Sequence, residues 1–278
     1  MITKQSPAKI NLILRVLGKR DDGYHDILSL MQKISLYDEM EFRLTDKGIG
    51  IHCPGSDIPE DRNNIVYKAA ESLFSHASYD YGVDIIIRKK IPIAAGLGGG
   101  SSNAATTLVT LNDMIGLNYT TEELMKIGAK IGADVPFFVF SRTAWVSGIG
   151  DRIEKACTLP PMWFVLINPN FEVSTKEIYE KLKLRLTKRT IRYSVQRFRL
   201  VPRIAGSLYN DLEIVSLRTY PILSRIKELL IVHGALGSLM SGSGPTVFGI
   251  FRDEKDATGA ARELGKSNIG SVYTAHSI

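Results

Sequence analysis

A glycine-rich segment contains the residues whose types and spacing most clearly suggest chemistry. From Pro92 to Ala105 the sequence reads PIAAGLGGGSSNAA, with four glycines in the five positions from Gly96 to Gly100. Glycines allow successive backbone N–H groups to turn toward one point, and a helix that begins at Ser101 adds free N–H groups and the positive end of its dipole. Ser101 or Ser102 can present a hydroxyl to a phosphate oxygen. The segment predicts a triphosphate cradle, and a glycine-rich turn that caps a helix is the structural alternative.

Two charged residues are candidates for acting on an acceptor hydroxyl. Asp134 precedes the apolar run Val135–Phe140, where an ionised carboxylate is costly unless it is paired or functional. Lys9 interrupts an apolar, strand-like run, and an ammonium near Asp134 would keep that carboxylate ionised and help to polarise a hydroxyl. An Asp at a turn or helix terminus and an outward-facing strand Lys are the structural alternatives. Whether Asp134 would accept a proton outright or chiefly stabilise a transferred phosphoryl group stays open, because loose transition states need little base assistance.

Better-known nucleotide motifs do not match. The glycine upstream of Gly265-Lys266-Ser267 is Gly259, one position too far for a Walker A loop. Gly96-x-Gly98 is followed by Ser101 where the dinucleotide fingerprint needs a third glycine. The His-Arg-Asp and Asp-Phe-Gly triplets of protein kinases do not occur in the sequence.

The composition is that of an ordinary folded protein. The 278 residues are 44% hydrophobic and 23% charged, which excludes disorder of the whole chain. The longest apolar stretches fall far short of the ~20 residues of a membrane helix, and the polar start lacks a signal core, so we expect a cytoplasmic protein without a membrane partner. Cys53 and Cys157 are too few for a disulfide framework, and neither they nor the five histidines have metal-ligand spacing, so we expect no intrinsic metal site.

The net charge of +6 originates in one segment. Residues Lys181–Arg203 contain nine basic side chains and no acidic one, whereas the rest of the chain has 26 basic and 29 acidic residues. Only Tyr193 and Phe198 supply aromatic rings there, which is sparse for a nucleic-acid surface. A solvated basic surface is favoured over nucleic-acid binding, and steering of an anionic small substrate is a third possibility. We therefore expect no nucleic-acid partner.

The strands and helices do not alternate regularly, which indicates an α+β fold and not a doubly wound parallel sheet. Alternating apolar residues over 8–16 and turn residues over Gly18–Gly23 predict an early β-hairpin. Either Asn63 or Asn64 is placed to cap a helix that continues to residue 74. The other expected strands cover 83–88, 163–167, 246–251 and 271–274, and the other expected helices cover 101–114, 176–182, 255–264 and a segment that begins at 121. A soft boundary near residues 150–160 divides the chain into domains of residues 1–155 and 156–278.

Five sequence blocks, in order along the chain, resemble the GHMP kinase superfamily. They are SPAKINL from Ser6, GYH from Gly23, the loop Pro92–Ala105, GADVPFF from Gly132 and SGSGPTVF from Ser241. Five coincident blocks are far more specific than a single glycine loop. The resemblance covers nearly the whole chain and is weakest between Lys181 and Ser207.

The resemblance implies a fold and an activity. The family fold joins an N-terminal α+β domain of the ribosomal S5 domain 2 type to a ferredoxin-like C-terminal domain, with the active site in the cleft between them. The implied reaction transfers the γ-phosphate of ATP, with Mg²⁺ carried by the nucleotide, to the 2-hydroxyl of 4-diphosphocytidyl-2-C-methyl-D-erythritol. This small-molecule acceptor is a cytidyl diphosphate sugar alcohol of non-mevalonate isoprenoid precursor biosynthesis. Alternatives are a kinase for another small alcohol, such as homoserine or mevalonate, and a non-catalytic RNA-binding protein.

The resemblance also implies roles for single residues, with Lys9 and Asp134 as the catalytic pair. Asn11 lies two residues from Lys9, on the same face of the strand, and matches a substrate-contacting Asn. Tyr24 and His25 are implied to bind the cytidine end, where a ring can stack on a base and an imidazole can bond to its edge.

Thr175 and Tyr179, four apart on an expected helix, are implied to close the cytosine pocket. The implied ATP-binding residues are Pro92, Ile93, Ala94, Ala95, Gly96, Leu97, Gly98, Gly99, Gly100, Ser101, Ser102 and Asn63. For Asn63 a helix cap is an equal alternative to an adenine contact. The second glycine motif, Ser241–Pro245, precedes a strand, and we expect it to pack beside the phosphate loop. Oligomeric state cannot be read from the sequence.

Overall fold

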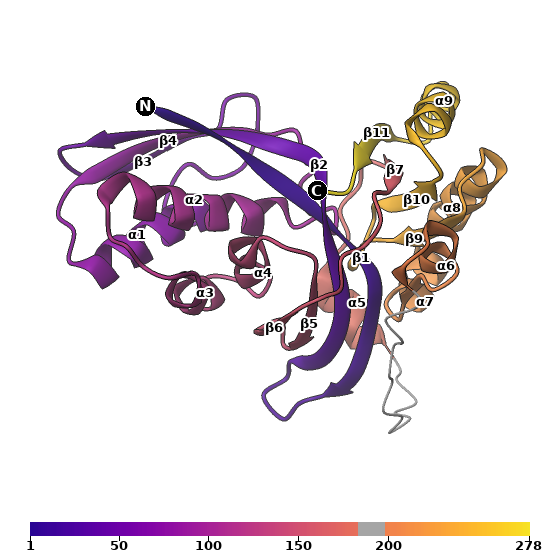
Figure 1. Cartoon of the computed structure of the whole chain (residues 1–278), viewed down its shortest axis with the longest axis horizontal. Coiled ribbons are helices and arrows are strands. Elements are labelled where there is room, and N and C mark those ends of the chain that lie inside the picture. The colour runs from indigo at the N-terminus through magenta and orange to yellow at the C-terminus, as the bar shows by residue number, and fades with distance from the viewer. Residues whose placement is uncertain (183–197) are drawn as a thin grey trace. The chain divides into compact units, whose positions relative to one another are not determined.

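The computed structural model describes residues 1–182 and 198–278, which fold into two compact units. Unit 1 comprises Met1–Ala8, Leu36–Pro92 and Gly98–Arg142, and unit 2 comprises Lys9–Ser35, Ile93–Leu97 and Thr143–Ile278. Two long strands, β1 (Ile2–Lys19) and β2 (His25–Thr45), supply residues to both units (Figure 1). Within unit 2 a short turn joins them, closed by a 2.8 Å hydrogen bond from the Arg20 N–H to the Tyr24 carbonyl oxygen. The expected early hairpin is confirmed.

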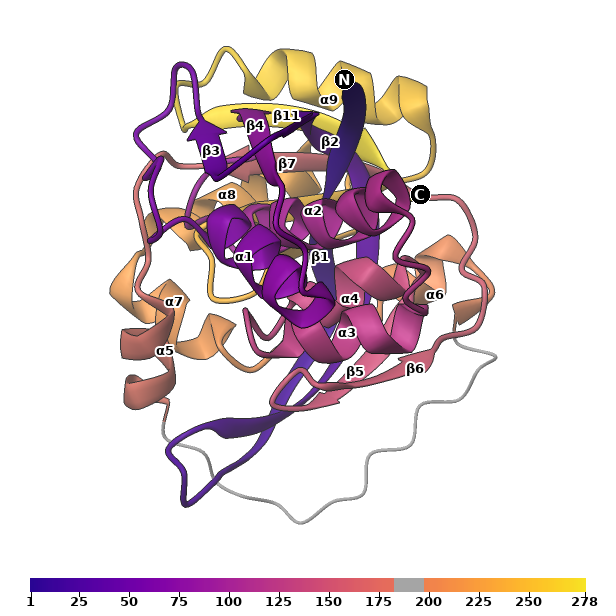
Figure 2. The same cartoon turned by 90° about the vertical axis from the view of Figure 1, so that its left-hand side faces the viewer.

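Unit 1 combines a small sheet with four helices. In the sheet, β2 pairs antiparallel with β4 (Gly82–Arg88), and β3 (Ile49–His52) pairs parallel with β4. Val83, Ile85 and Ile87 are fully buried and the residues between them are half-buried, as expected for a strand with one covered face. The helices are α1 (Ile65–Ala77), α2 (Gly99–Ile115), α3 (Thr121–Ala129) and α4 (Val135–Phe140), and Figure 2 shows α1 beside α2.

The helix starts in unit 1 follow local capping chemistry. The Asn64 side chain accepts a 2.9 Å hydrogen bond from the Val66 N–H and caps α1. Thr120 and Glu123 form a capping box at the start of α3. In contrast, α2 begins at Gly99, two residues before the expected serines, because Gly98 in a left-handed conformation (φ 69°) already turns the chain into the helix.

Unit 2 contains an antiparallel sheet of four strands in the order β11-β7-β10-β9. Their bounds are β7 Trp163–Asn168, β9 Gly237–Met240, β10 Val247–Phe251 and β11 Ser271–His276. With helices after β7 and after β10, this is the β-α-β-β-α-β ferredoxin-like arrangement that the resemblance implied. Elsewhere in the unit, β5 (Ala144–Gly148) pairs with β2 and with β6 (Arg152–Lys155), and β8 (Tyr209–Asn210) pairs parallel with β1.

Two helices share one core with this sheet. In Figure 1, α8 (Ile222–Val232) and α9 (Glu254–Leu264) lie on the same side of it. Leu223, Ile226 and Leu230 recur at helical spacing and are fully buried in that core. The remaining helices are α5 (Thr175–Lys181), α6 (Val201–Ala205) and α7 (Glu213–Thr219). Among all helices in the described residues, none has the length and apolar character to cross a membrane.

Candidate active site

The glycine-rich segment leads directly into α2. Ala94, Gly96 and Gly98 have φ angles of 51°, 75° and 69°, a region that glycine adopts without strain. The first hydrogen bond of the helix runs from the Ser102 N–H to the Gly98 carbonyl oxygen at 2.9 Å. The N–H groups of residues 99–101 therefore precede the ladder of the helix, at the positive end of its dipole. This end of α2 has the chemistry to bind an anion.

The two serines of this segment differ in their surroundings. Ser102 is fully buried, and its Oγ accepts a 2.8 Å hydrogen bond from Ser6 Oγ. Ser101 is half-buried, and its Oγ lies 3.8 Å from the point where a Cβ on Gly132 would stand. Of the two hydroxyls, that of Ser101 is therefore the one that a ligand at the helix end can reach.

A buried ion pair supports the first turn of α2. The fully buried Asp38 carboxylate contacts the ammonium of Lys89 and accepts hydrogen bonds from the N–H groups of residues 90–91, at 2.8 and 2.9 Å. Asn103, in α2, donates a 3.0 Å hydrogen bond to the same carboxylate. The Lys89 ammonium lies 3.2 Å from the point where a Cβ on Gly99 would stand. Asp38 thus joins the first turn of α2 to the chain that follows β4.

Asp134 is the N-cap residue of α4 and is half-buried. A side chain that caps its own helix normally requires an extended backbone, whereas Asp134 has φ −87° and ψ −10°. In the described part of unit 1, its carboxylate makes no capping hydrogen bond to α4. Asp134 is thus a helix-terminus residue, but a capping hydrogen bond does not explain why a carboxylate stands at this position.

Asn63 lies in the exposed turn before α1. Its side-chain amide donates a 3.1 Å hydrogen bond to Asp61. Because Asn64 takes the capping position, the cap interpretation of Asn63 is wrong. Its contact with adenine stays a prediction.

Lys9 and Asn11 form a buried polar group in unit 2, as their two-residue spacing on β1 predicts. They are 4% and 1% exposed, and Lys9 Nζ donates a 2.7 Å hydrogen bond to Asn11 Oδ1. Asn11 Nδ2 donates to Ser29 Oγ at 2.8 Å, and Ser29 Oγ donates to the Ile13 carbonyl oxygen at 2.7 Å. A buried ammonium is costly without such partners. The alternative of an outward-facing lysine is therefore wrong.

The turn Ser241–Gly244 packs against the phosphate loop within unit 2. Ser241 Oγ donates a 2.9 Å hydrogen bond to the Gly96 carbonyl oxygen. A Cβ on Gly242 would stand 3.3 Å from the Gly96 Cα. The expected packing of the second glycine motif beside the phosphate loop is confirmed.

The turn Ser241–Gly244 also lies close to one implied catalytic residue and one implied acceptor-binding residue. Lys9 Nζ lies 3.6 Å from the point where a Cβ on Gly242 would stand. The hydroxyls of Ser243 and Thr175 are 2.7 Å apart. Within unit 2, this turn therefore brings together residues implied for catalysis, for ATP and for the acceptor.

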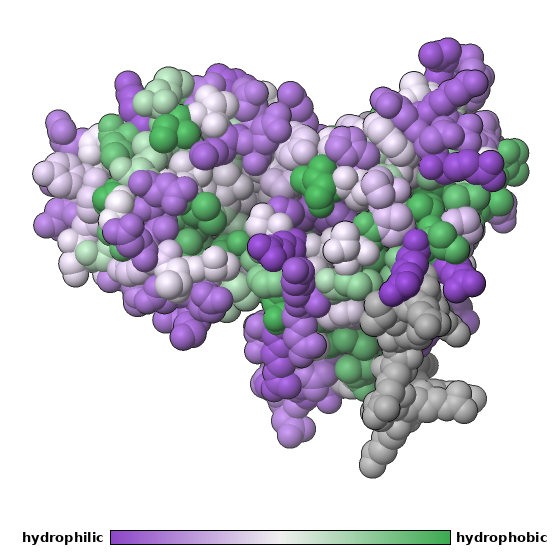
Figure 3. All heavy atoms as spheres, viewed as in Figure 1, coloured by the Kyte–Doolittle hydropathy of each residue, from purple (hydrophilic) through white to green (hydrophobic). Residues whose placement is uncertain are grey.

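The residues implied for the cytidine end come together in part. The His25 and Tyr179 rings have centroids 4.9 Å apart and planes inclined at 34°. Tyr24 is 63% exposed at the tip of the hairpin between β1 and β2, which is strongly hydrophilic in Figure 3. Burial, and secondarily the charge of Lys19, lowers the pKa of His25 below its usual 6.5. The shift favours the neutral form of His25, which has one donor and one acceptor nitrogen.

Comparison with known families gives two matches. Residues 64–142 match the GHMP kinases N terminal domain, and residues 190–270 match the GHMP kinases C terminal region. The chain is 56% identical over 278 residues to the 4-diphosphocytidyl-2-C-methyl-D-erythritol kinase of Syntrophus aciditrophicus (strain SB), with 100% of both chains covered. It is 47% identical over 261 residues to the kinase of the same name from Syntrophotalea carbinolica, with 93% of this chain and 92% of that relative covered. The chain belongs to the GHMP kinase family.

Solved structures agree with this family and fold. A crystal structure of 4-(cytidine 5'-diphospho)-2C-methyl-D-erythritol kinase matches this GHMP kinase with a TM-score of 0.82 and 31% identity, over 99% of both chains. A homoserine kinase from Cytophaga hutchinsonii matches with a TM-score of 0.74 and 19% identity, over 100% of this chain and 94% of that one. At that identity the second likeness shows the fold alone. The fold that the resemblance implied is confirmed.

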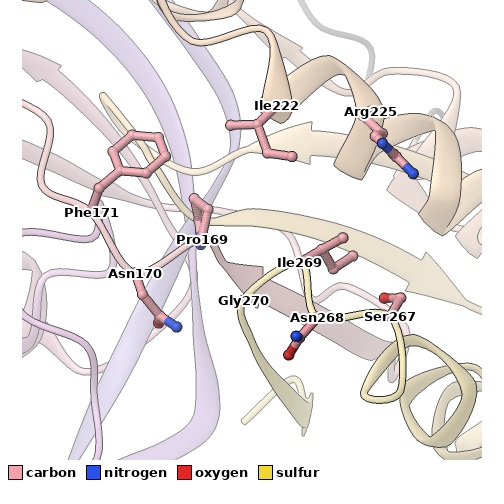
Figure 4. Close-up of a pocket in the computed structure, with 9 residues that line it drawn as sticks. All are labelled: Pro169, Asn170, Phe171, Ile222, Arg225, Ser267, Asn268, Ile269 and Gly270. Carbon is pink, nitrogen blue, oxygen red and sulfur yellow. The ribbon is translucent and has the colours of Figure 1, made fainter.

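A separate cavity of about 510 Å³ lies in unit 2 of this GHMP kinase. It is lined by residues 169–171, by Ile222 and Arg225 of α8, and by residues 267–270 (Figure 4). None of these described lining residues is a predicted site residue. The cavity is therefore distinct from the residues implied for the kinase reaction.

Some residues around the candidate site were missed from the sequence. Ser29 holds the amide of Asn11, and Asp38 holds the first turn of α2. For Ser29 the available signal was a polar residue inside the apolar stretch Ile27–Met31, whereas Asp38 stands beside Glu39 in a mixed stretch and had no such signal. That signal marks a buried polar group but does not identify its partner.

The basic segment falls largely outside the described residues. Six of its nine basic residues lie between 183 and 197, and Lys181, Arg199 and Arg203 lie within the described part. The three interpretations of this segment stay open.

Proposed function

We propose that this GHMP kinase transfers the γ-phosphoryl group of MgATP to the 2-hydroxyl of 4-diphosphocytidyl-2-C-methyl-D-erythritol, which yields the 2-phosphate and ADP. The observation that carries this proposal is the 56% identity, over the whole length, to a relative named for that acceptor. The anion-binding end of α2 and the buried ammonium of Lys9 are consistent with phosphoryl transfer, which needs positioning and charge stabilisation more than covalent chemistry.

We assign the acceptor hydroxyl to Asp134 and Lys9. The Asp134 carboxylate is proposed to receive the hydroxyl proton, or to align the hydroxyl while negative charge moves to the leaving ADP. The Lys9 ammonium is proposed to polarise the hydroxyl oxygen and to offset the negative charge of the transferred group. Its hydrogen bond to Asn11 fixes where that charge stands.

We assign the phosphates of ATP to the N–H groups of residues 99–101 and to the Ser101 hydroxyl. Mg²⁺ enters with the nucleotide as part of the MgATP substrate. The left-handed residues of the loop from Pro92 to Gly98 shape the backbone that approaches the phosphates, and Asn63 is assigned to the adenine end.

We assign the cytidine end of the acceptor to unit 2. The paired rings of His25 and Tyr179 form a platform on which a pyrimidine can stack, and Tyr24 offers a further ring from the exposed hairpin tip. Thr175 and Asn11 supply a hydroxyl and an amide for hydrogen bonds to the acceptor.

Two coarser assignments accompany the reaction. We propose that the enzyme acts in the cytoplasm, where its co-substrate ATP is abundant. We also propose a sequence boundary near residue 155, because the matched family ranges, 64–142 and 190–270, fall on either side of it.

The test is ADP release by the purified protein with MgATP and each of four acceptors: the diphosphocytidyl methylerythritol, homoserine, mevalonate and galactose. We expect turnover with the cytidyl acceptor alone. We expect Asp134→Asn and Lys9→Met each to lower kcat by about 100-fold or more.

Matched controls separate chemistry from folding. Asp113→Asn changes an exposed carboxylate on α2 of the same unit as Asp134, and Lys4→Met changes an exposed lysine on the same strand as Lys9. Both controls should keep kcat within about twofold, because surface substitutions away from a site have small effects. Turnover with another acceptor would contradict the proposed substrate, and full activity of Asp134→Asn would contradict the proposed site.

A further inference from the structure

Asn210 is a buried amide whose two N–H groups and carbonyl oxygen all have hydrogen-bond partners. It is 4% exposed and belongs to β8. Its Nδ2 donates hydrogen bonds to the carbonyl oxygens of Met240 at 2.8 Å and Gly242 at 2.7 Å, and its Oδ1 accepts one from the Leu212 N–H at 3.0 Å. The two N–H groups therefore hold the last carbonyl oxygen of β9 and one carbonyl oxygen of the turn that follows it.

The backbone around Asn210 is fixed against β1, the strand that carries Lys9. Leu14 of β1 is the register partner of Asn210, and its carbonyl oxygen accepts a 3.0 Å hydrogen bond from the Asp211 N–H. The Asp211 carboxylate accepts a 2.8 Å hydrogen bond from the Val16 N–H. The backbone at Asn210 is thus held by β1, and the side-chain amide of Asn210 holds the turn.

The turn that Asn210 holds contacts the groups assigned to the reaction. Gly242, whose carbonyl oxygen Asn210 binds, has φ 57° and stands close to Lys9 Nζ and to Gly96. The adjacent Ser241 donates to the Gly96 carbonyl oxygen. A shift of this turn would therefore move the surroundings of the Lys9 ammonium and of the phosphate loop together.

We propose that Asn210 is a positioning residue for phosphoryl transfer. By holding the Met240 and Gly242 carbonyl oxygens, it fixes the turn against which the Lys9 ammonium and the Gly96 backbone are placed. This proposal rests on the assignment of Lys9 to the reaction under the proposed function. Only a side chain with two donors in a fixed fork satisfies both carbonyls, so an amide is required and a carboxylate of the same shape is not equivalent.

The test uses the full chain with Asn210→Asp, which keeps the shape of the side chain and replaces two donors with an acceptor. We expect kcat with MgATP and the cytidyl acceptor to fall by about 30- to 100-fold, since small misplacements of catalytic groups have effects of this size. We expect KM for the acceptor to change by less than about threefold, because the loss concerns the transition state and not substrate binding.

The pH dependence of kcat distinguishes a positioning role of Asn210 from a merely structural one. Burial beside two carbonyl oxygens raises the pKa of the introduced carboxyl, and in its protonated form that group regains one O–H donor. The deficit in kcat relative to the wild type should therefore shrink as the pH is lowered from about 8 to about 6. Asn112→Asp is the matched control, because Asn112 is also a buried, hydrogen-bonded amide, at the far end of α2. It should keep kcat within about twofold and show no such pH-dependent recovery.

The possible outcomes distinguish a failure of the proposed function from a failure of the proposed role of Asn210. If the wild type does not turn over the cytidyl acceptor, the proposed function fails and this inference fails with it. If the wild type is active and folded Asn210→Asp retains its kcat, only the role of Asn210 is overturned. If circular dichroism shows that Asn210→Asp does not fold, Ser241→Ala replaces it, because it removes the hydroxyl that links the same turn to Gly96. A kcat unchanged by Ser241→Ala would then overturn the proposal, and a loss at constant acceptor KM would support it.

Discussion

Ser241 Oγ donates a 2.9 Å hydrogen bond to the carbonyl oxygen of Gly96, although the two residues are 145 positions apart in the sequence. Gly96 has φ 75°, and a Cβ added to it would overlap the carbonyl oxygen of Ser241. The contact therefore depends on glycine for both its backbone conformation and its lack of a side chain. The phosphate loop and the second glycine turn are shaped to fit each other.

Gly96→Ala should therefore impair the enzyme far more than Gly259→Ala, which changes an exposed glycine on α9 of the same unit. Alanine at residue 96 meets a left-handed φ and the Ser241 carbonyl oxygen, whereas a Cβ on Gly259 would have none of the described residues beyond its own helix within 4 Å. We expect Gly96→Ala to raise KM for MgATP or lower kcat by about 10-fold or more, and Gly259→Ala to change each by less than about threefold. Steady-state kinetics of the two variants test this. Equal kinetics of the two would contradict the fitted contact.

Ser29→Ala should weaken use of the acceptor by releasing Asn11. Ser29 is fully buried, accepts from the Asn11 amide and donates to the Ile13 carbonyl oxygen. Loss of this hydroxyl leaves the Asn11 N–H and the Ile13 carbonyl oxygen without that partner, at a cost of about 1–2 kcal/mol in the free energy of unfolding. A displaced Asn11 amide should in addition lower kcat/KM for the acceptor by about 10-fold. Ser238→Ala, which removes a part-buried hydroxyl bonded to the Lys227 carbonyl oxygen, is the control and should leave kcat/KM unchanged. An unchanged kcat/KM in Ser29→Ala would show that Asn11 needs no such support.

The pKa of His25 should lie below 6.5, chiefly because of burial and secondarily because of Lys19. A histidine whose pKa is lower in the folded than in the unfolded protein contributes its full stabilisation when the pH is above the unfolded-state pKa. This contribution is lost as the pH falls through the folded-state pKa. NMR titration of the His25 ring should show this low pKa, and Lys19→Gln should raise it. Lys255→Gln, which changes an exposed lysine on α9 of the same unit, should leave the pKa of His25 unchanged, because Lys19 is the lysine whose charge lowers it.

Protonation of His25 should also affect acceptor binding. If the neutral ring supports the cytidine end, KM for the cytidyl acceptor should rise as the pH falls below the pKa of His25, and the change should be weaker in His25→Asn. The pH dependence of KM for MgATP should be the same in both proteins. Identical acceptor profiles for the wild type and His25→Asn would contradict this role.

Local sequence signals predicted the parts of the fold that local chemistry determines. Asn64, one of the two expected caps, caps α1, α3 begins at Thr121 as expected, and the glycine loop leads into α2, because each of these needs only neighbouring residues. Non-local partners were not predictable in this way. Val16 bonds to Asp211, 195 residues away, and a pattern read along one chain gives no indication of that pairing.

Helix α8 was missed for a different reason. Ile222, Leu223, Ile226 and Leu230 have helical spacing, but α8 lacks a capping side chain at its start, where Pro221 takes the N-cap position.

The candidate site also combines residues that local patterns predict with residues that only tertiary contacts place. Lys9 and Asn11 were placed on one face by strand periodicity, whereas Ser29 and Asn210 are set by tertiary contacts.

Removal of the Asp38 carboxylate should destabilise unit 1 more than removal of the Lys89 ammonium, its ion-pair partner. Asp38→Ala leaves the Lys89 ammonium, two backbone N–H groups and the Asn103 amide without their common acceptor. Breaking a buried pair in this way costs about 3–5 kcal/mol in the free energy of unfolding. Lys89→Met leaves Asp38 with three N–H donors, so its cost should be smaller, at about 1–2 kcal/mol. Denaturant unfolding of each variant measures the difference.

The surface pair Arg43–Asp84 provides the control within the same unit. Its contact is short, at 2.6 Å, but the Arg43 side chain is 68% exposed, and exposed pairs contribute about 0–1 kcal/mol. Asp84→Ala should therefore cost much less than Asp38→Ala. The double variant Asp38→Ala with Lys89→Met should lose less than the sum of the two single losses, because the uncompensated ammonium is removed with the carboxylate. Additive losses would mean that the two side chains do not stabilise each other, and that Asp38 supports α2 only through its hydrogen bonds to the backbone and to Asn103.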